Sequence, residues 1–187
     1  MKKSVKLFTT CLLAGWSHWL LAEEAEKRPW SPYMLGFSTE STLPSKNHDV
    51  YGIRLSLLGA ECYDFTGIDI GLGVSYINGH GRGVQLSPIN IANTFSGLQL
   101  GLGNYCRGNM AGIQIGVVNC AYPMTGVQIG FINISDADGG LLQIGIINWG
   151  SEKPLVQIGL FNSEGFFNFN NREPKGFQIP FLFRVNF

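Results

Sequence analysis

The chain has 187 residues, of which 25 are glycine and 13 are phenylalanine, and its 13 basic and 13 acidic residues give a formal net charge of zero. Charged residues make up 14% of the chain, against about 25% in ordinary soluble domains, while the apolar content of 45% is ordinary. This composition excludes a disordered chain, and the zero net charge excludes recruitment of nucleic acid by a whole-chain basic field. One folded domain is expected at this length.

Residues 1–22 have the features of a secretory signal peptide. Three lysines precede an apolar stretch over residues 7–21, and Leu20-Leu21-Ala22 forms a cleavage site before two glutamates. The stretch is shorter than the ~20 apolar residues that a membrane-spanning helix needs, which favours a signal over an anchor. We therefore expect an exported protein, with an N-terminal extension over residues 23–32 and a single repeat-built β domain over residues 33–187.

An eight-residue motif recurs through most of the chain after the signal. Its best copies read G-L-Q-L-G-L-G-N at 97–104, G-I-Q-I-G-V-V-N at 112–119 and G-V-Q-I-G-F-I-N at 126–133. The apolar residues alternate with small or polar ones, which predicts β-strands, and turn-forming residues lie between the copies. The fold class is therefore all-β. The central motif position, which we call the repeat face, holds Arg54, Asp69, Gln85, Gln99, Gln114, Gln128, Gln143, Gln157 and Gln178.

The spacing of the copies is compatible with two all-β architectures. From Gln85 to Gln157 the central glutamines are separated by steps of 14, 15, 14, 15 and 14 residues. Each step is either one coil of a parallel β-solenoid, with asparagines stacked at each corner, or one strand of an up-and-down meander. The alternating step favours hairpins, whereas the constant direction of the motif is more natural in a solenoid. We predict an antiparallel meander of about ten strands that closes into a barrel, with a parallel β-solenoid of 14–15-residue coils as the alternative.

Charge is nearly absent from the central part of the chain. Between residues 83 and 135 the only charged side chain is Arg107, where an ordinary soluble domain would carry roughly 13. Ten tilted strands of ~10 residues would span about 25 Å, the height of the apolar band of an outer-membrane barrel. One face of the sheet is therefore expected to face lipid, in the outer membrane or at the cell surface of a diderm bacterium.

The C-terminal segment gives an independent indication of the same location. Residues 177–187 place Phe181, Phe183, Val185 and Phe187 on one face of a strand. This pattern is similar to the last-strand signal by which outer-membrane barrels of Gram-negative bacteria are recognised by their insertion machinery. Outer-membrane lipid and that insertion machinery are the partners that it implies.

The motif copies, the opening segment 49–55 and the aromatic C-terminal strand together resemble a family of bacterial surface-repeat proteins. Members of that family carry tandem G-L-Q-I-G-L-V-N units behind a signal peptide. The resemblance covers about residues 33–187 and implies an exported, surface-associated protein, but it carries no catalytic residues. The chain departs from the family pattern where Arg54 and Asp69 replace glutamine and where Ser87-Pro88 replaces the glycine and apolar pair.

Motifs for catalysis or metal binding are not found. His48 and His80 lie 32 residues apart without a metal-ligand spacing, and the glycine-rich segment 79–83 lacks the lysine of a P-loop. The segment 136–140 begins like a calcium loop but lacks its bidentate glutamate, and no serine lies in a G-x-S-x-G context. We expect no enzyme, cofactor or metal, and instead a structural, adhesive or passive-pore role. The alternative is a soluble periplasmic or secreted interaction protein.

Two pairs of residues have positions that depend on the repeat register. Arg54 and Asp69 occupy the same motif position 15 residues apart, so in either architecture they are predicted to leave the same face of neighbouring strands as an opposite-charge pair. Cys106 and Cys120 follow consecutive copies. In a barrel they would lie at opposite ends of neighbouring strands, whereas in a solenoid they would stack and could pair.

Overall fold

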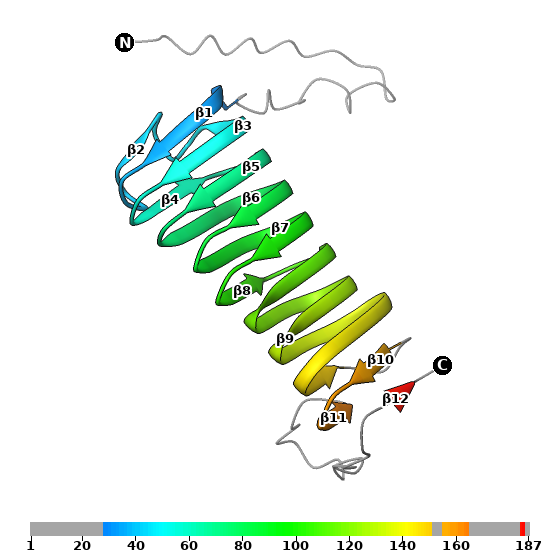
Figure 1. The fold of residues 1–187 in the computed structure, drawn as a ribbon. Helices are drawn as coiled ribbons and strands as arrows, with labels where there is room; N and C mark the ends of the chain where they lie inside the picture. Colours follow the sequence, from blue (N-terminus) through cyan, green and yellow to red (C-terminus); the bar gives the residue numbers. More distant parts are fainter. Residues whose placement is uncertain (1–27, 151–154, 165–183, 186–187) are drawn as a thin grey trace, which may run out of the picture.

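The structure, a computed structural model, describes residues 28–150, 155–164 and 184–185, and they form a parallel β-solenoid (Figure 1). From Asp49 onward the chain winds in coils of 14 to 16 residues, and each coil lies on the one before it. The strands are β1 (Trp30–Gly36), β2 (Thr42–Leu43), β3 (Asp49–Ser56), β4 (Gly59–Cys62), β5 (Phe65–Gly71), β6 (Val74–Leu86), β7 (Ile89–Leu100), β8 (Gly103–Cys106), β9 (Met110–Gly150), β10 (Leu155–Ile158), β11 (Phe161–Glu164) and β12 (Arg184–Val185). Among the described residues no helix is long and apolar enough to cross a membrane.

Corresponding motif positions pair between coils. Gln85 of β6 pairs with Gln99 of β7, and Gln99 pairs with Gln114 of β9, in parallel register. Among the described strands the antiparallel pairs are β1–β2 and β10–β12, at the two ends of the solenoid. β1 starts at Trp30, so the sheet begins slightly before the expected domain boundary at residue 33.

The predicted antiparallel barrel is wrong, and the solenoid alternative is the observed fold. The alternation of 14- and 15-residue steps favoured hairpins in the sequence analysis, but the position of the additional residue in the 15-residue steps explains it differently. From Gln85 to Gln157 each glutamine is followed by an asparagine five residues later, so the additional residue of a 15-residue step always falls between that asparagine and the next glutamine. The additional residue lies in a turn at the same edge of the solenoid each time. The alternation therefore carries no information about hairpins.

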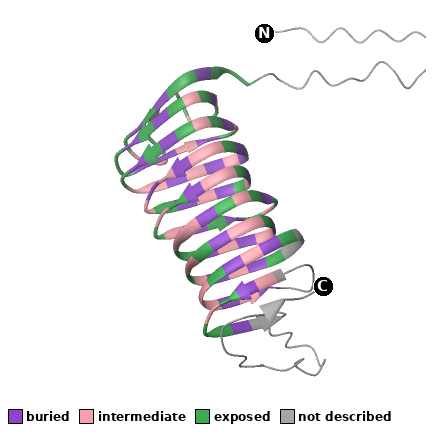
Figure 2. Cartoon of the chain, turned by 45° about the vertical axis from the view of Figure 1, so that its right-hand side comes forward, coloured by how far each residue is buried: buried purple, intermediate pink, exposed green. Residues whose placement is uncertain are grey.

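Each coil has two walls. The first wall carries the repeat face, and the second carries the asparagines, as in β7, which includes both Asn90 and Gln99. Burial alternates along both walls, so that buried positions line up from coil to coil (Figure 2). An apolar core of Phe65, Phe95 and Met110 with other small or apolar residues fills the interior on one side of the amide groups.

In the coils from Gly52 to Gly126, the motif position two residues before each repeat-face residue has no room for a side chain. The six glycines there, from Gly52 to Gly126, have φ angles between +122° and +149°, which side-chain-bearing residues rarely adopt. A Cβ atom on Gly112 would lie 2.1 Å from the carbonyl oxygen of Gly97 in the preceding coil. The recurring glycine of the motif therefore lets successive coils approach to hydrogen-bonding distance.

Candidate functional site

The repeat face forms a continuous ladder of amides inside the solenoid. From Gln99 to Gln157, each glutamine Nε2 donates to the Oε1 of the glutamine one coil earlier, at 2.8 Å in every step. All of these side chains are fully buried. Buried amides are costly unless their hydrogen bonds are made, and identical residues at the coil spacing make them for each other. The repeat-face residues from Gln85 to Gln157 point inward, a direction that the sequence motif left open. Gln178 lies outside the described residues.

A second ladder of asparagines runs along the opposite wall. Asn104 Nδ2 donates to Asn119 Oδ1 at 2.8 Å and to the carbonyl oxygen of Ile115 at 2.9 Å, and equivalent bonds continue to Asn162. The asparagines donate toward the C-terminal coil, whereas the glutamines donate toward the N-terminal coil. The dipoles of the two ladders therefore oppose each other and largely cancel along the axis.

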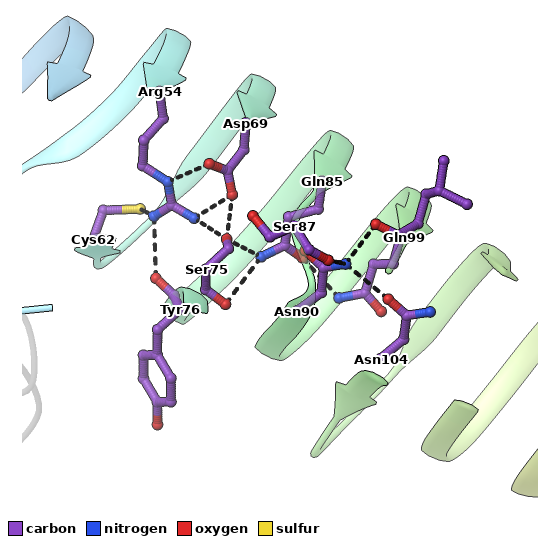
Figure 3. A network of polar contacts seen from close by, with 11 residues as sticks. Arg54, Cys62, Asp69, Ser75, Tyr76, Gln85, Ser87, Asn90, Gln99 and Asn104 are labelled. Carbon is purple, nitrogen blue, oxygen red and sulfur yellow. Dashed lines mark hydrogen bonds and ion pairs between the residues drawn. The ribbon is translucent and has the colours of Figure 1, made fainter. Parts of the chain in front are cut away.

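The glutamine ladder ends at a buried charge cluster in the first coils (Figure 3). Gln85 Nε2 donates to Ser75 Oγ at 2.5 Å, and Ser75 Oγ in turn donates to Asp69 Oδ2. Arg54 holds Asp69 in a bidentate pair, with Nε to Oδ1 at 3.0 Å and Nη2 to Oδ2 at 2.6 Å. The structure thus places Arg54 and Asp69 side by side, as the repeat register predicts.

The remaining contacts of Arg54 complete the cluster. Its Nη1 donates to Cys62 Sγ at 2.8 Å and to the Tyr76 carbonyl oxygen at 3.1 Å, and its guanidinium lies 5.1 Å from the centre of the Phe65 ring. Burial lowers the pKa of Arg54, but the interactions with Cys62 and Asp69 raise it by more, so the side chain stays charged. Arg54 and Asp69 are both fully buried. Both charged side chains are closed off from solvent, and through Ser75 the cluster accepts the hydrogen bond of Gln85 Nε2, the donor at the N-terminal end of the glutamine ladder.

The three cysteines among the described residues are free thiols. Cys106 points into the interior and pairs in register with Ala121, while Cys120 lies in the outward position beside Tyr105. The expected stacking of Cys106 on Cys120 is therefore wrong, because their positions in the coil differ by one residue and point to opposite sides of the wall.

Burial makes the interior thiols unreactive. Desolvation raises the pKa values of Cys62 and Cys106 from 9.0 to about 11. In the chain that starts at Glu23, and so lacks Cys11, we expect iodoacetamide at pH 8 to modify Cys120 first in the folded state. In urea all three thiols should react at similar rates, because the thiolate is the reactive form. Intact mass over time counts the adducts, and Cys120→Ser is the control that should abolish the fast one. Fast modification of Cys62 in the folded chain would contradict the buried cluster.

The buried thiols of Cys62 and Cys106 should make the free energy of unfolding depend on pH in the alkaline range. Below pH 9 they are protonated in both the folded and the unfolded chain, so their contribution is constant. Between pH 9 and 11 the unfolded chain releases their protons while the folded chain keeps them, and the free energy of unfolding should fall. Urea titrations at pH 8, 9.5 and 11 measure this, with Cys106→Ala expected to reduce the decrease.

His80 is exposed and His48 is half-buried, and the segments 79–83 and 136–140, which the sequence predicts as turns, belong to β6 and β9. His48 Nδ1 is 3.1 Å from Ser45 Oγ, and His80 Nδ1 is 2.6 Å from Thr94 Oγ1 in the next coil. Asp136, which begins the loop that resembles a calcium site, is exposed. Among the described residues no cluster of three or more histidine, cysteine, aspartate or glutamate side chains is placed to hold a metal ion.

The outer surface of the solenoid is apolar along one edge. We call the turn between the two walls of each coil the apolar edge. It comprises Leu57, Leu58, Leu72, Pro88, Leu102, Val117, Phe131, Ile146 and Leu160. Several of these side chains are more than half exposed, among them Leu72 at 72% and Leu102 at 64%. Such a continuous row is unusual for a soluble monomer.

Two rows of aliphatic residues flank the apolar edge, one on each wall. On the first wall they are Leu55, Ile70, Leu86, Leu100, Ile115, Ile129, Ile144 and Ile158, and on the second wall Val74, Ile89, Val118, Ile132, Ile147 and Phe161. The opposite edge of each coil, which we call the polar edge, includes Asp64, His80, Asn93, Arg107, Asn109 and Asp136. The cross-section is therefore amphipathic, although the sequence motif alone does not separate the two edges.

Comparisons with protein-family models, with curated proteins and with solved structures found no match to the chain. The functional argument therefore depends on the geometry of the chain itself.

Proposed function

We propose that this chain is an exported, membrane-associated surface protein with a structural or adhesive role. The observation that supports it is the inverted distribution of side chains. Fully buried amides share the interior with the apolar core, while 27 large hydrophobic side chains remain exposed among the described residues. Removing the exposed half of one aliphatic side chain from water contributes on the order of 1 kcal/mol, so a surface of this kind favours contact with an apolar partner.

A structural or adhesive role fits the interior better than a passive pore does. Gln114 and Asn119 lie on opposite walls of one coil, and each is fully buried and hydrogen-bonded along its ladder. Side chains therefore occupy the space that a lumen would need. The regular stack, with its polar groups used internally, supports a scaffold rather than an enzyme. The last-strand signal stays a prediction, because among its residues only Val185 belongs to the described strand β12.

Fractionation of a diderm bacterium that expresses the full chain tests this function. We expect the protein in the outer-membrane fraction, released by detergent and not by high salt, with mass spectrometry showing cleavage after Ala22. A variant that starts at Glu23 is the control, and it should remain in the cytoplasm. Folded protein recovered entirely from the soluble periplasm would favour the alternative, a soluble interaction protein, and would exclude the membrane role.

A further inference from the structure

We propose that the apolar edge inserts into one leaflet of a lipid bilayer, with the axis of the solenoid parallel to the membrane plane. This inference rests on the proposed function in placing the chain beside a membrane. It goes further by naming lipid acyl chains as the partner and by assigning one edge of the coils to them.

The backbone at the apolar edge meets the requirement that lipid imposes. Peptide groups in contact with acyl chains must be hydrogen-bonded within the protein, because no water is available to them. The turn residues satisfy this by bonding to the preceding coil. Leu102 N donates to the carbonyl oxygen of Pro88 at 2.8 Å, and Val117 N donates to that of Leu102 at 2.9 Å. The same pattern begins with Leu57 N, which donates to Gly36 O at 2.8 Å.

Side chains change character with distance from the apolar edge in the order that a membrane interface requires. Next to the aliphatic rows, the second wall carries Tyr76, Tyr105 and Trp149, each directly after a buried serine or asparagine. The same row also includes Glu61, Ile91 and Cys120. Tyrosine and tryptophan are enriched at the level of lipid headgroups. The guanidinium of Arg107, on the polar edge, lies 5.6 Å from the centre of the Tyr76 ring. No charged residue between 50 and 150 belongs to the apolar edge or its flanking rows.

The dimensions of the apolar part fit one leaflet. Tyr105 follows Leu102 by three residues on an extended strand, which places the aromatic ring about 10 Å from the edge. Amphipathic elements that lie in the interface bury their apolar side about 5–10 Å deep. The solenoid therefore has an apolar part deep enough to anchor in one leaflet.

The shape of the apolar edge favours lipid over a second copy of the chain. The edge is a convex ridge with aliphatic rows on both of its sides, and a rigid ridge of the same shape would leave one side of each copy uncovered. Acyl chains adapt to both sides. They also fit the shallow apolar grooves at the ends of the ridge, one beside Ile129, Ile144 and Leu160 and the other beside Leu57 and Leu72.

Flotation with uncharged phosphatidylcholine vesicles tests the inference. We expect the purified chain to float with vesicles in both low and high salt. Leu102→Glu/Val117→Glu, which adds two charges to the apolar edge, should weaken binding at least tenfold. Asn93→Glu/Asn109→Glu adds the same charge to the exposed polar edge and should bind like the unmodified chain. Circular dichroism checks that each variant retains its strands.

The other possible outcomes distinguish lipid from a protein partner. Equal flotation of both double variants would overturn the assignment of the edge while leaving the membrane role intact. A chain that fractionates with membranes in cells but ignores pure lipid would overturn the inference and point to a protein anchor. A stable dimer in buffer that no longer binds vesicles would identify a second copy as the occupant.

Quenching of Trp149 by brominated lipids gives an independent readout that does not depend on disturbing the edge. In a Trp30→Phe background Trp149 is the remaining tryptophan after the signal. We expect strongest quenching by lipids brominated near the headgroup. Introducing tryptophan at Leu102, with Trp149→Phe, should shift the strongest quenching toward lipids brominated deep in the acyl chain. No difference between the two probes would overturn the proposed orientation.

Discussion

Replacing Gly112 by alanine is expected to lower the free energy of unfolding by about 3 kcal/mol or more. Two costs combine at this position. The φ angle of +139° is unfavourable for any residue with a Cβ atom, and that atom would meet the Gly97 carbonyl oxygen at 2.1 Å. The colliding atom belongs to the backbone of a stacked coil, so it cannot move aside without separating β7 from β9. Urea titration by circular dichroism measures the loss.

Gly103→Ala is the matched control for this prediction. Gly103 lies in β8, only nine residues before Gly112, yet a Cβ atom there meets nothing within 4 Å. Its neighbours in register, Ile89 and Val118, already carry side chains at that outward position. We expect a change within about 0.5 kcal/mol. Should both alanine variants unfold at the same urea concentration, the glycine row would not be the place where the coils approach most closely.

The repeat motif predicts which residues are neighbours on adjacent strands, but it does not predict whether those strands run parallel or antiparallel. Copies in phase place residues of equal motif position side by side, which is why the pairing of Arg54 with Asp69 follows from their spacing. Strand direction does not follow in the same way. A period-two alternation is identical in parallel and antiparallel strands, and the one-residue insertions at the polar edge produced a two-copy period that hairpins would also give.

The inward direction of the glutamines was also not decided by the motif. A single copy pairs three polar or small positions with three apolar ones, and burial of the apolar side is the usual outcome. Here the stack reverses this, because Gln99 and its equivalents bond to one another at the coil spacing, which gives both Nε2 and Oε1 of a buried amide a partner. The apolar residues then face outward. A single motif cannot satisfy the hydrogen bonds of a buried amide. Only repetition of the motif offsets the cost of burying it.

The cluster at the end of the ladder was only partly accessible from the sequence. Arg54 and Asp69 stood out because they replace glutamine. Cys62 and Ser75 did not, because they come from the opposite wall of the coils and reach Arg54 across the interior. Their contact depends on the width of the coil, which the spacing of the motif does not define.

The pair at the end of the glutamine ladder should show strong energetic coupling. Arg54→Gln or Asp69→Gln alone leaves a buried charge without its partner, which costs about 3–5 kcal/mol. Replacing both should recover most of that loss, because glutamines at the two positions extend the ladder that begins at Gln85. Urea titrations of the two single variants and the double variant give the coupling free energy.

An exposed ion pair serves as the control that separates the effect of burial from the effect of charge pairing. Lys46 and Glu40 form an ion pair of similar length, with Nζ to Oε2 at 2.7 Å, but both side chains are exposed. Water stabilises each charge of such a pair by itself, so Lys46→Gln, Glu40→Gln and the double variant should each leave the free energy of unfolding nearly unchanged. Additive effects of Arg54→Gln and Asp69→Gln would contradict the bidentate contact. Coupling at the buried pair together with none at the exposed pair would establish that the enclosed interior of the coil, rather than ion pairing as such, makes each charge of the cluster depend on its partner.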